Sequence, residues 1–166
     1  HQKKVALLAS AISEELGLPK DIIDGICVSG LLHDVGKISV PNDILAKPGQ
    51  LTEGEFIIVK NHPVVSYDIL KSIEFPWSVA DIVSQHHEKI NGSGYPKGLK
   101  GREIRIEAKI LAVADGVEAM TAHRPYRPAL GIKKAIQEIL NNKSKLYDKK
   151  RVDACIKVLE KKKIKL

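Results

Sequence analysis

The feature that most constrains this chain is the segment Leu-Leu-His-Asp-Val-Gly-Lys at residues 31–37. Ile22 and Ile26 precede His33 at helical spacing, so the imidazole continues an apolar helix face, and Asp34 continues the neighbouring one. An imidazole and a carboxylate buried side by side are costly unless something compensates them. A bound cation would compensate them, and so would a hydrogen bond within the core; a single pair does not distinguish the two.

The same pattern recurs along the chain, and this recurrence favours the cation. Four further polar residues continue apolar stripes at helical spacing, namely His1, His86, His87 and Asp115. His62 is less regular, because Pro63 follows it and should end the preceding helix there. Imidazole and carboxylate ligands suit Fe, Mn, Zn or Ni, and this set exceeds the four ligands of a closed structural zinc site. The sequence therefore predicts a site for more than one metal ion.

Helix start and stop signals predict an all-α domain. Gly17 ends a first amphipathic stretch, Thr52 with Glu55 forms a capping box, and Asp148 is placed to cap the last helix. No stretch shows the alternation typical of a strand. The expected helices cover residues 3–16, 19–33, 52–61, a segment after 63, 76–87, 105–120, 132–140 and 149–161.

Three segments break the helical pattern and are expected to be loops. Residues 35–49 contain two prolines and two glycines, which predicts an ordered but irregular connection, and residues 121–128 form a shorter loop. The longest loop, residues 88–103, is rich in glycine. A loop of this length is unusual without a function. Because it directly follows His86 and His87, we expect it to border the metal site.

Composition excludes several classes of protein. A chain of 166 residues suffices for one domain with its own core. The net charge is +7, but the lysines are concentrated at residues 161–165 and on helix faces that we expect to be exposed. Because no aromatic residues are interleaved with them, no nucleic acid polymer is expected as a partner. No apolar run approaches the roughly 18 to 20 residues of a membrane span, and no signal peptide is seen, which predicts a cytoplasmic protein without membrane insertion. Cys27 and Cys155 suggest inert thiols.

With these residues in hand, the chain resembles the HD-GYP family, a branch of the HD-domain metal-dependent phosphohydrolases. The resemblance covers essentially the whole sequence. It rests on an ordered series of motifs, which are His1, His33-Asp34-Val35-Gly36-Lys37, His62-Pro63, His86-His87-Glu88, Gly92-Ser93-Gly94-Tyr95-Pro96, Asp115 and Arg124-Pro125-Tyr126-Arg127. It implies an HD-domain-like helical bundle that hydrolyses cyclic di-guanosine monophosphate (c-di-GMP) to linear pGpG, GMP or both in bacterial signalling. Because a predicted ligand stands at residue 1, we expect residues 1–166 to be an HD-GYP domain that is a fragment lacking an upstream regulatory domain.

The resemblance also implies a metal set. Family members use two or three transition-metal ions, most often Fe or Mn, with Zn or Ni as alternatives, and a solvent hydroxide between the metals attacks the phosphodiester. A third ion would need a carboxylate upstream of residue 1. The implied ligands are His1, His33 and Asp115 for one ion, His62, His86 and His87 for the other, and Asp34 as the bridge between them.

Substrate contacts are implied in the same way. Lys37 would act beside the scissile phosphate, and Lys37 and Asp34 would be the catalytic residues. Tyr95 would stack on a guanine or form a hydrogen bond with it. Arg124 matches an arginine that grips phosphate, and Arg127 is a weaker candidate of the same kind. The Gly-Tyr-Pro loop would contact GGDEF-type cyclase domains, and the family pattern is compatible with a homodimer.

Departures from the family pattern leave two alternatives open. Asn91 stands where many members have aspartate, His123 replaces a residue that is usually acidic, and residues 116–118 vary the usual sequence after Asp115. One alternative is an HD hydrolase of another cyclic dinucleotide or nucleotide. The other is a module that binds c-di-GMP without cleaving it, against which the intact series of ligands argues.

Overall fold

The computed structural model describes residues 1–122 and 131–161, and this part of the chain is helical apart from loops and two isolated β-bridges. The predicted all-α class is therefore confirmed. Among these residues, no helix combines the length and apolar character needed to cross a bilayer. The elements in chain order are α1 (Gln2–Glu15), α2 (Lys20–Leu32), η1 (Val35–Ser39), α3 (Asn42–Leu45), α4 (Glu53–Lys60), α5 (His62–Leu70), α6 (Val79–Ser84), η2 (Gly101–Glu103), α7 (Ile106–Thr121), α8 (Ile132–Asn141) and α9 (Lys149–Glu160).

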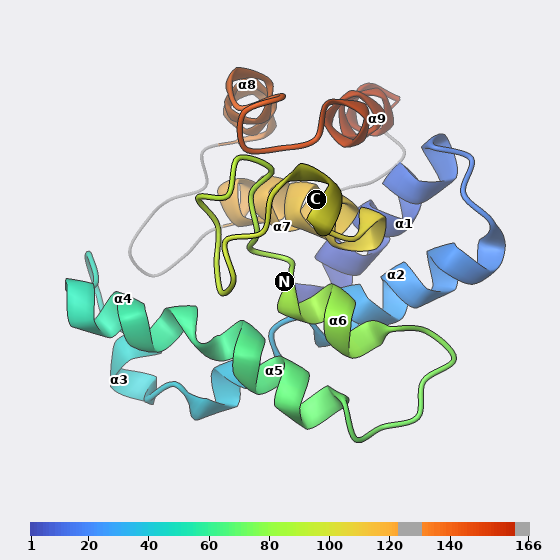
Figure 1. Ribbon diagram of the computed structural model, residues 1–166. Coiled ribbons are helices and arrows are strands. Elements are labelled where there is room, and N and C mark those ends of the chain that lie inside the picture. Colours follow the sequence, from blue (N-terminus) through green and yellow to red (C-terminus); the bar gives the residue numbers. More distant parts are fainter. Residues whose placement is uncertain (123–130, 162–166) are drawn as a thin grey trace.

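Helix α7 is the central element of the molecule. It packs against α1, α8 and α9, and its Leu111 and Val113 are fully buried together with Leu8 and Ile12 of α1. Figure 1 shows α8 and α9 on one side of α7, and α3, α4 and α5 on the opposite side. Burial of each large aliphatic side chain contributes roughly 1.5–3 kcal/mol, so this apolar centre fixes where the ends of α1 and α7 meet.

Local capping signals end or begin the helices where the sequence predicted. The Thr52 hydroxyl accepts a hydrogen bond from the Glu55 amide at 3.3 Å, and the Glu55 carboxylate accepts one from the Thr52 amide at 2.7 Å. The Asp148 carboxylate accepts hydrogen bonds from the first amides of α9. Gly17, with φ at +70°, follows α1 in the left-handed conformation that favours glycine.

Two segments differ from the predictions. Residues 35–49 were expected to be irregular, yet they contain η1 and α3, which are short helical turns. Helix α6 begins at Val79 and not at the predicted Pro76, because Phe75 and Trp77 pack against a small apolar cluster and the Val79 amide bonds the Trp77 carbonyl at 2.8 Å. Helix α6 also ends at Ser84, before the predicted end at residue 87, so the two histidines at 86–87 lie in the turn that follows it.

A close contact between η1 and α5 depends on Gly36. The Gly36 amide donates a hydrogen bond to the Ser66 hydroxyl at 2.8 Å. A Cβ atom placed on Gly36 would lie 2.1 Å from the His62 carbonyl oxygen and 2.6 Å from the Ser66 amide nitrogen, far closer than real contacts allow. Only glycine therefore permits this approach, which sets Asp34 beside the start of α5.

Candidate metal centre

All seven predicted metal ligands converge at the middle of the molecule. His1 lies near α6 and α7 at the N-terminus labelled in Figure 1. The other ligands come from the end of α2, the start of α5, the turn after α6 and the middle of α7. Three groups have ligand atoms within 4.8 Å of one another: His62 with His86 and His87, His1 with His33 and Asp115, and His33 with Asp34 and His86.

The backbone fixes the orientation of three of these imidazoles. In each, the Nδ1 atom lies 2.6–2.7 Å from the carbonyl oxygen three residues earlier. Because a carbonyl only accepts hydrogen bonds, Nδ1 must carry the proton, and Nε2 keeps its lone pair for a ligand. The three pairs are His33 with Gly30, His62 with Val59, and His86 with Val83.

Asp34 lies between the groups of histidines. Its carboxylate is buried, and its Oδ2 atom is 3.5 Å from Nε2 of both His1 and His33. The other oxygen, Oδ1, is 3.4 Å from Nε2 of His62. Lys37 Nζ donates a hydrogen bond to Oδ2 at 2.7 Å. The two oxygens of one side chain thus face different histidines, as a carboxylate that bridges two metal ions requires.

Two buried atoms of the cluster have no hydrogen-bond partner among the described residues. They are Nε2 of His33 and Oδ1 of Asp34. Leaving a buried polar atom unsatisfied costs about 1–3 kcal/mol, and more for a charged group. A divalent cation bound to both atoms would remove this penalty, so the residues present fit a metal ion.

Burial keeps the central histidines neutral. It lowers the pKa of His62, lowers the pKa of His86 well below its usual value, and lowers the pKa of His87 to about 3. At neutral pH these three imidazoles are therefore uncharged, which is the form that binds metals.

The other three predicted ligands, Asp34, Asp115 and His1, have pKa values that favour a positive charge within the cluster. Burial alone would raise the pKa values of Asp34 and Asp115, but a hydrogen bond from His1 holds both well below the usual range, and Lys37 adds a second hydrogen bond and a positive charge at Asp34. Burial opposes ionisation of His1 as well, yet its hydrogen bonds to Asp115 and Asp34 raise its pKa to about 10. Both carboxylates are consequently ionised, and they stabilise a cation between them, whether imidazolium or metal.

Sequence reasoning missed Glu118, which orients His1. Its carboxylate is 2% exposed and forms a short hydrogen bond with Nδ1 of His1, directing Nε2 toward Asp34 and Asp115. The sequence held a partial signal, because Glu118 stands three residues after Asp115 on α7 and therefore on the same helix face, but it does not show whether that carboxylate is buried. A carboxylate that holds the second nitrogen of a ligating histidine is a recurrent feature of metal sites.

Glu88 is a second residue whose role the sequence did not indicate. It is 2% exposed and accepts hydrogen bonds from the backbone amides of Lys97 at 2.7 Å and Leu99 at 2.9 Å. A buried carboxylate next to His87 therefore holds the glycine-rich loop against the cluster. Tyr95 of this loop packs on His87, with ring centroids 4.7 Å apart and planes at 32°.

The predicted substrate residues fall into two sets. Lys37 and Tyr95 lie at the cluster, the first against Asp34 and the second on His87. Arg124, Arg127 and the sequence departure at His123 lie outside the described residues. The roles proposed for these side chains stay predictions.

Comparisons with known proteins find a matching family model and curated relatives. The model of the HD domain family matches residues 1–150. The chain is 42% identical over 160 residues to a cyclic di-GMP phosphodiesterase of Thermotoga maritima, which covers 95% of this chain and 44% of that protein. It is 37% identical over 141 residues to 3'3'-cGAMP-specific phosphodiesterase 1 of Vibrio cholerae, covering 85% of this chain and 32% of the relative. The chain thus spans less than half the length of these curated relatives.

A solved structure shows the same fold. An HDG"Y"P protein from Bdellovibrio bacteriovorus superposes with a TM-score of 0.79 at 20% sequence identity, over 96% of this chain and 51% of the other. At this level of identity the likeness concerns the arrangement of helices alone. It matches the helical bundle described above.

Proposed function

Since the chain belongs to the HD domain family, in its HD-GYP branch, we propose that it is a metal-dependent phosphodiesterase that hydrolyses c-di-GMP to pGpG, GMP or both. The observation that carries this proposal is the carboxylate of Asp34, whose two oxygens face different histidines within a cluster of seven ligands. HD domains bind divalent metal ions, and the names of the relatives supply the substrate class. Fe or Mn would suit the mixed nitrogen and oxygen ligands.

The ligands would divide into two sets around Asp34. Metal ions bound there would polarise phosphate oxygens and make water a better nucleophile at neutral pH. The chain's own contribution is to hold neutral imidazoles and ionised carboxylates in fixed positions before the substrate arrives. The first set is His1, His33 and Asp115, and the second is His62, His86 and His87.

Lys37 and Tyr95 would act on the substrate directly. An ammonium group is not a ligand for a divalent ion, so the proposed role of Lys37 is to neutralise negative charge on the scissile phosphate. Its Nζ lies 2.7 Å from the Asp34 carboxylate and is therefore at the edge of the cluster. Burial and the nearby charges of Asp115 and Asp34 raise the pKa of Tyr95, so its phenol stays protonated and can donate a hydrogen bond. Arg124 and Arg127 would grip phosphate oxygens, as the family resemblance implies.

One experiment tests the reaction and its substrate together. Protein reconstituted anaerobically with iron or manganese is incubated with c-di-GMP, 3'3'-cGAMP and cyclic di-AMP, and products are followed chromatographically. We expect c-di-GMP to be cleaved fastest. Faster cleavage of 3'3'-cGAMP would favour the reaction named for the Vibrio cholerae relative. Full metal content with binding but no cleavage of any substrate would overturn the proposal in favour of a binding module.

A further inference from the structure

A cleft of about 570 Å³ lies beside the metal centre. This volume is within the roughly 300–1,000 Å³ typical of small-molecule sites. Its walls come from the end of α4, the start of α5 and the glycine-rich loop, and they are largely apolar. The lining includes Ile58, Lys60, Asn61, Tyr95 and Pro96.

The cleft is directly connected to the proposed ligands. Asn61 immediately precedes His62, and the Tyr95 ring that lines the cleft packs on His87. A phosphate held at the metal centre would therefore carry its neighbouring nucleoside toward this cleft. The apolar lining suits a flat, uncharged ring system, as a nucleobase is.

Among the residues that the structure describes, Lys60 is the one lysine that lines this cleft. Lys60 is half-buried, and its Nζ lies 4.6 Å from the ring centroid of Phe56 and 5.6 Å from that of Tyr95. No carboxylate in the described parts of the chain forms an ion pair with it, whereas Lys37 and Lys47 are both paired with acids. Contacts with ring faces position the ammonium without occupying it with an oxygen or nitrogen acceptor. Its three N–H groups remain available to a ligand.

We propose that this cleft holds one purine base of the substrate and that Lys60 selects guanine over adenine. The inference rests on the proposed function and specifies it further. Guanine presents two adjacent acceptors, O6 and N7, on one edge, whereas adenine presents N7 beside an amino group that donates. An ammonium group finds two acceptors on guanine and meets a donor on adenine. Lys60 thus determines specificity, and the metal centre performs the reaction.

The test measures base preference with and without turnover. Isothermal titration calorimetry gives Kd values of the metal-loaded protein for GMP and AMP, and kcat/KM is measured for c-di-GMP and cyclic di-AMP. The variants are Lys60→Met, which removes the donors, and Lys60→Arg, which keeps them. Lys71→Met is the matched control, because Lys71 also lies over a tyrosine ring, at 5.7 Å from the Tyr67 centroid, but does not line the cleft.

We expect Lys60→Met to reduce the preference for GMP over AMP by about tenfold, the lower range for loss of one base-specific contact. The ratio of kcat/KM values should fall equally, whereas Lys60→Arg and Lys71→Met should keep both preferences. An unchanged preference in Lys60→Met, or an equal loss in Lys71→Met, would overturn the assignment of Lys60. If the wild type cleaves no cyclic dinucleotide but Lys60→Met still loses the GMP preference, the proposed reaction fails and the base site stands.

Discussion

Asp34 shows how much one side chain can contribute to such a site. Asp34 is 6% exposed, yet its carboxylate stays ionised because hydrogen bonds from His1 and Lys37 and the positive charge of Lys37 outweigh the effect of burial. Its two oxygens face different histidines, Oδ2 toward His1 and Oδ1 toward His62. An amide of the same shape would offer one oxygen and one N–H group, and so could serve only one of the two directions.

Asp34→Asn should therefore abolish turnover and release metal. Loss of residues that merely support a ligand weakens metal binding by roughly 10- to 100-fold, and loss of a shared ligand should do at least as much. Elemental analysis and steady-state kinetics on the same sample provide the measurement. Asp68→Asn removes an exposed carboxylate paired with Lys71 and is the control. Wild-type metal content in Asp34→Asn would refute the bridging role.

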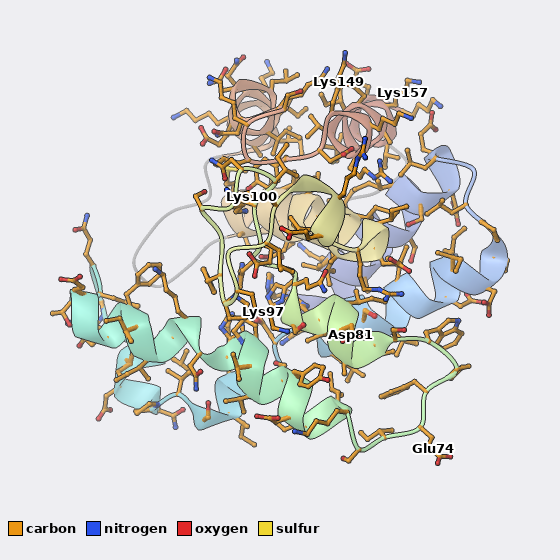
Figure 2. All side chains as sticks on the ribbon, viewed as in Figure 1. Glu74, Asp81, Lys97, Lys100, Lys149 and Lys157 are labelled. Carbon is orange, nitrogen blue, oxygen red and sulfur yellow. The ribbon has the colours of Figure 1, made fainter. Side chains whose placement is uncertain are left out.

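Glu118→Gln should weaken metal binding without removing a ligand. Glutamine can still accept a hydrogen bond from His1 but lacks the charge that raises the basicity of the imidazole. We therefore expect the affinity for metal to fall roughly 10-fold in Glu118→Gln and up to about 100-fold in Glu118→Ala. Competition with a chromogenic chelator measures this affinity. Glu74→Gln changes an exposed carboxylate at the edge of the molecule, far from α7, and should have no effect (Figure 2). Equal affinities for all three variants would exclude an orienting role.

At the scale of helices and turns, signals that act within a few residues predicted the structure well. Gly17, the Thr52 capping box and Asp148 mark helix ends that the structure confirms. The late start of α6 could not be predicted, because it depends on where Phe75 and Trp77 find apolar partners from distant parts of the chain.

The candidate metal centre shows the same difference between local signals, which the sequence reveals, and tertiary contacts, which it does not. Apolar periodicity and motif order singled out every residue of the three groups that could hold a metal ion, even though His86 and His87 lie beyond the end of α6. The contributions of Glu118 and Glu88 were missed, because a buried carboxylate in the sequence looks the same as an exposed one. Only tertiary contacts with His1 and with the loop amides distinguish them.

Gly36→Ala tests the contact between η1 and α5. The new Cβ would collide with the backbone at His62, so the two segments must separate, and overpacking of this kind costs roughly 1–3 kcal/mol. Thermal unfolding measures the loss. Gly54→Ala is the opposite control, since nothing lies within 4 Å of its Cβ position in α4 and alanine should stabilise the helix by about 0.5–1 kcal/mol. A wild-type melting temperature for Gly36→Ala would show that the segments adjust freely.

At the scale of the whole molecule, the metal centre connects parts of the chain that are far apart in sequence. The proposed ligands extend from residue 1 to residue 115 and join α1, α2, α5 and α7 with the turn after α6. The charge of the molecule has a different distribution. Lys149 and Lys157 lie on α9 at the edge remote from α5, where solvent surrounds them (Figure 2). Lysines such as these therefore lie on a solvated surface. The candidate metal centre is stabilised by its own carboxylates.

Removing metal should consequently destabilise the entire fold. A ligand present at 100 times its Kd stabilises the native state by about 2.7 kcal/mol, which for a chain of this size corresponds to a change in Tm of roughly 5–10 °C. Differential scanning fluorimetry before and after treatment with a chelator measures the change. The same treatment should have a much smaller effect on Asp34→Asn, which has less metal to lose. Equal shifts in both proteins would mean that the chelator acts elsewhere.

Gly36 stands two residues after Asp34, but the reason for its presence is steric and independent of metal chemistry. If the proposed hydrolysis were lost in a descendant, His33 or Asp34 could be exchanged and the chain still fold, whereas exchanging Gly36 would require rebuilding the contact with α5. Over the course of descent, the glycine should therefore outlast the His-Asp pair. A related chain that keeps the glycine and lacks the pair would mark a lineage in which catalysis was lost and the architecture inherited.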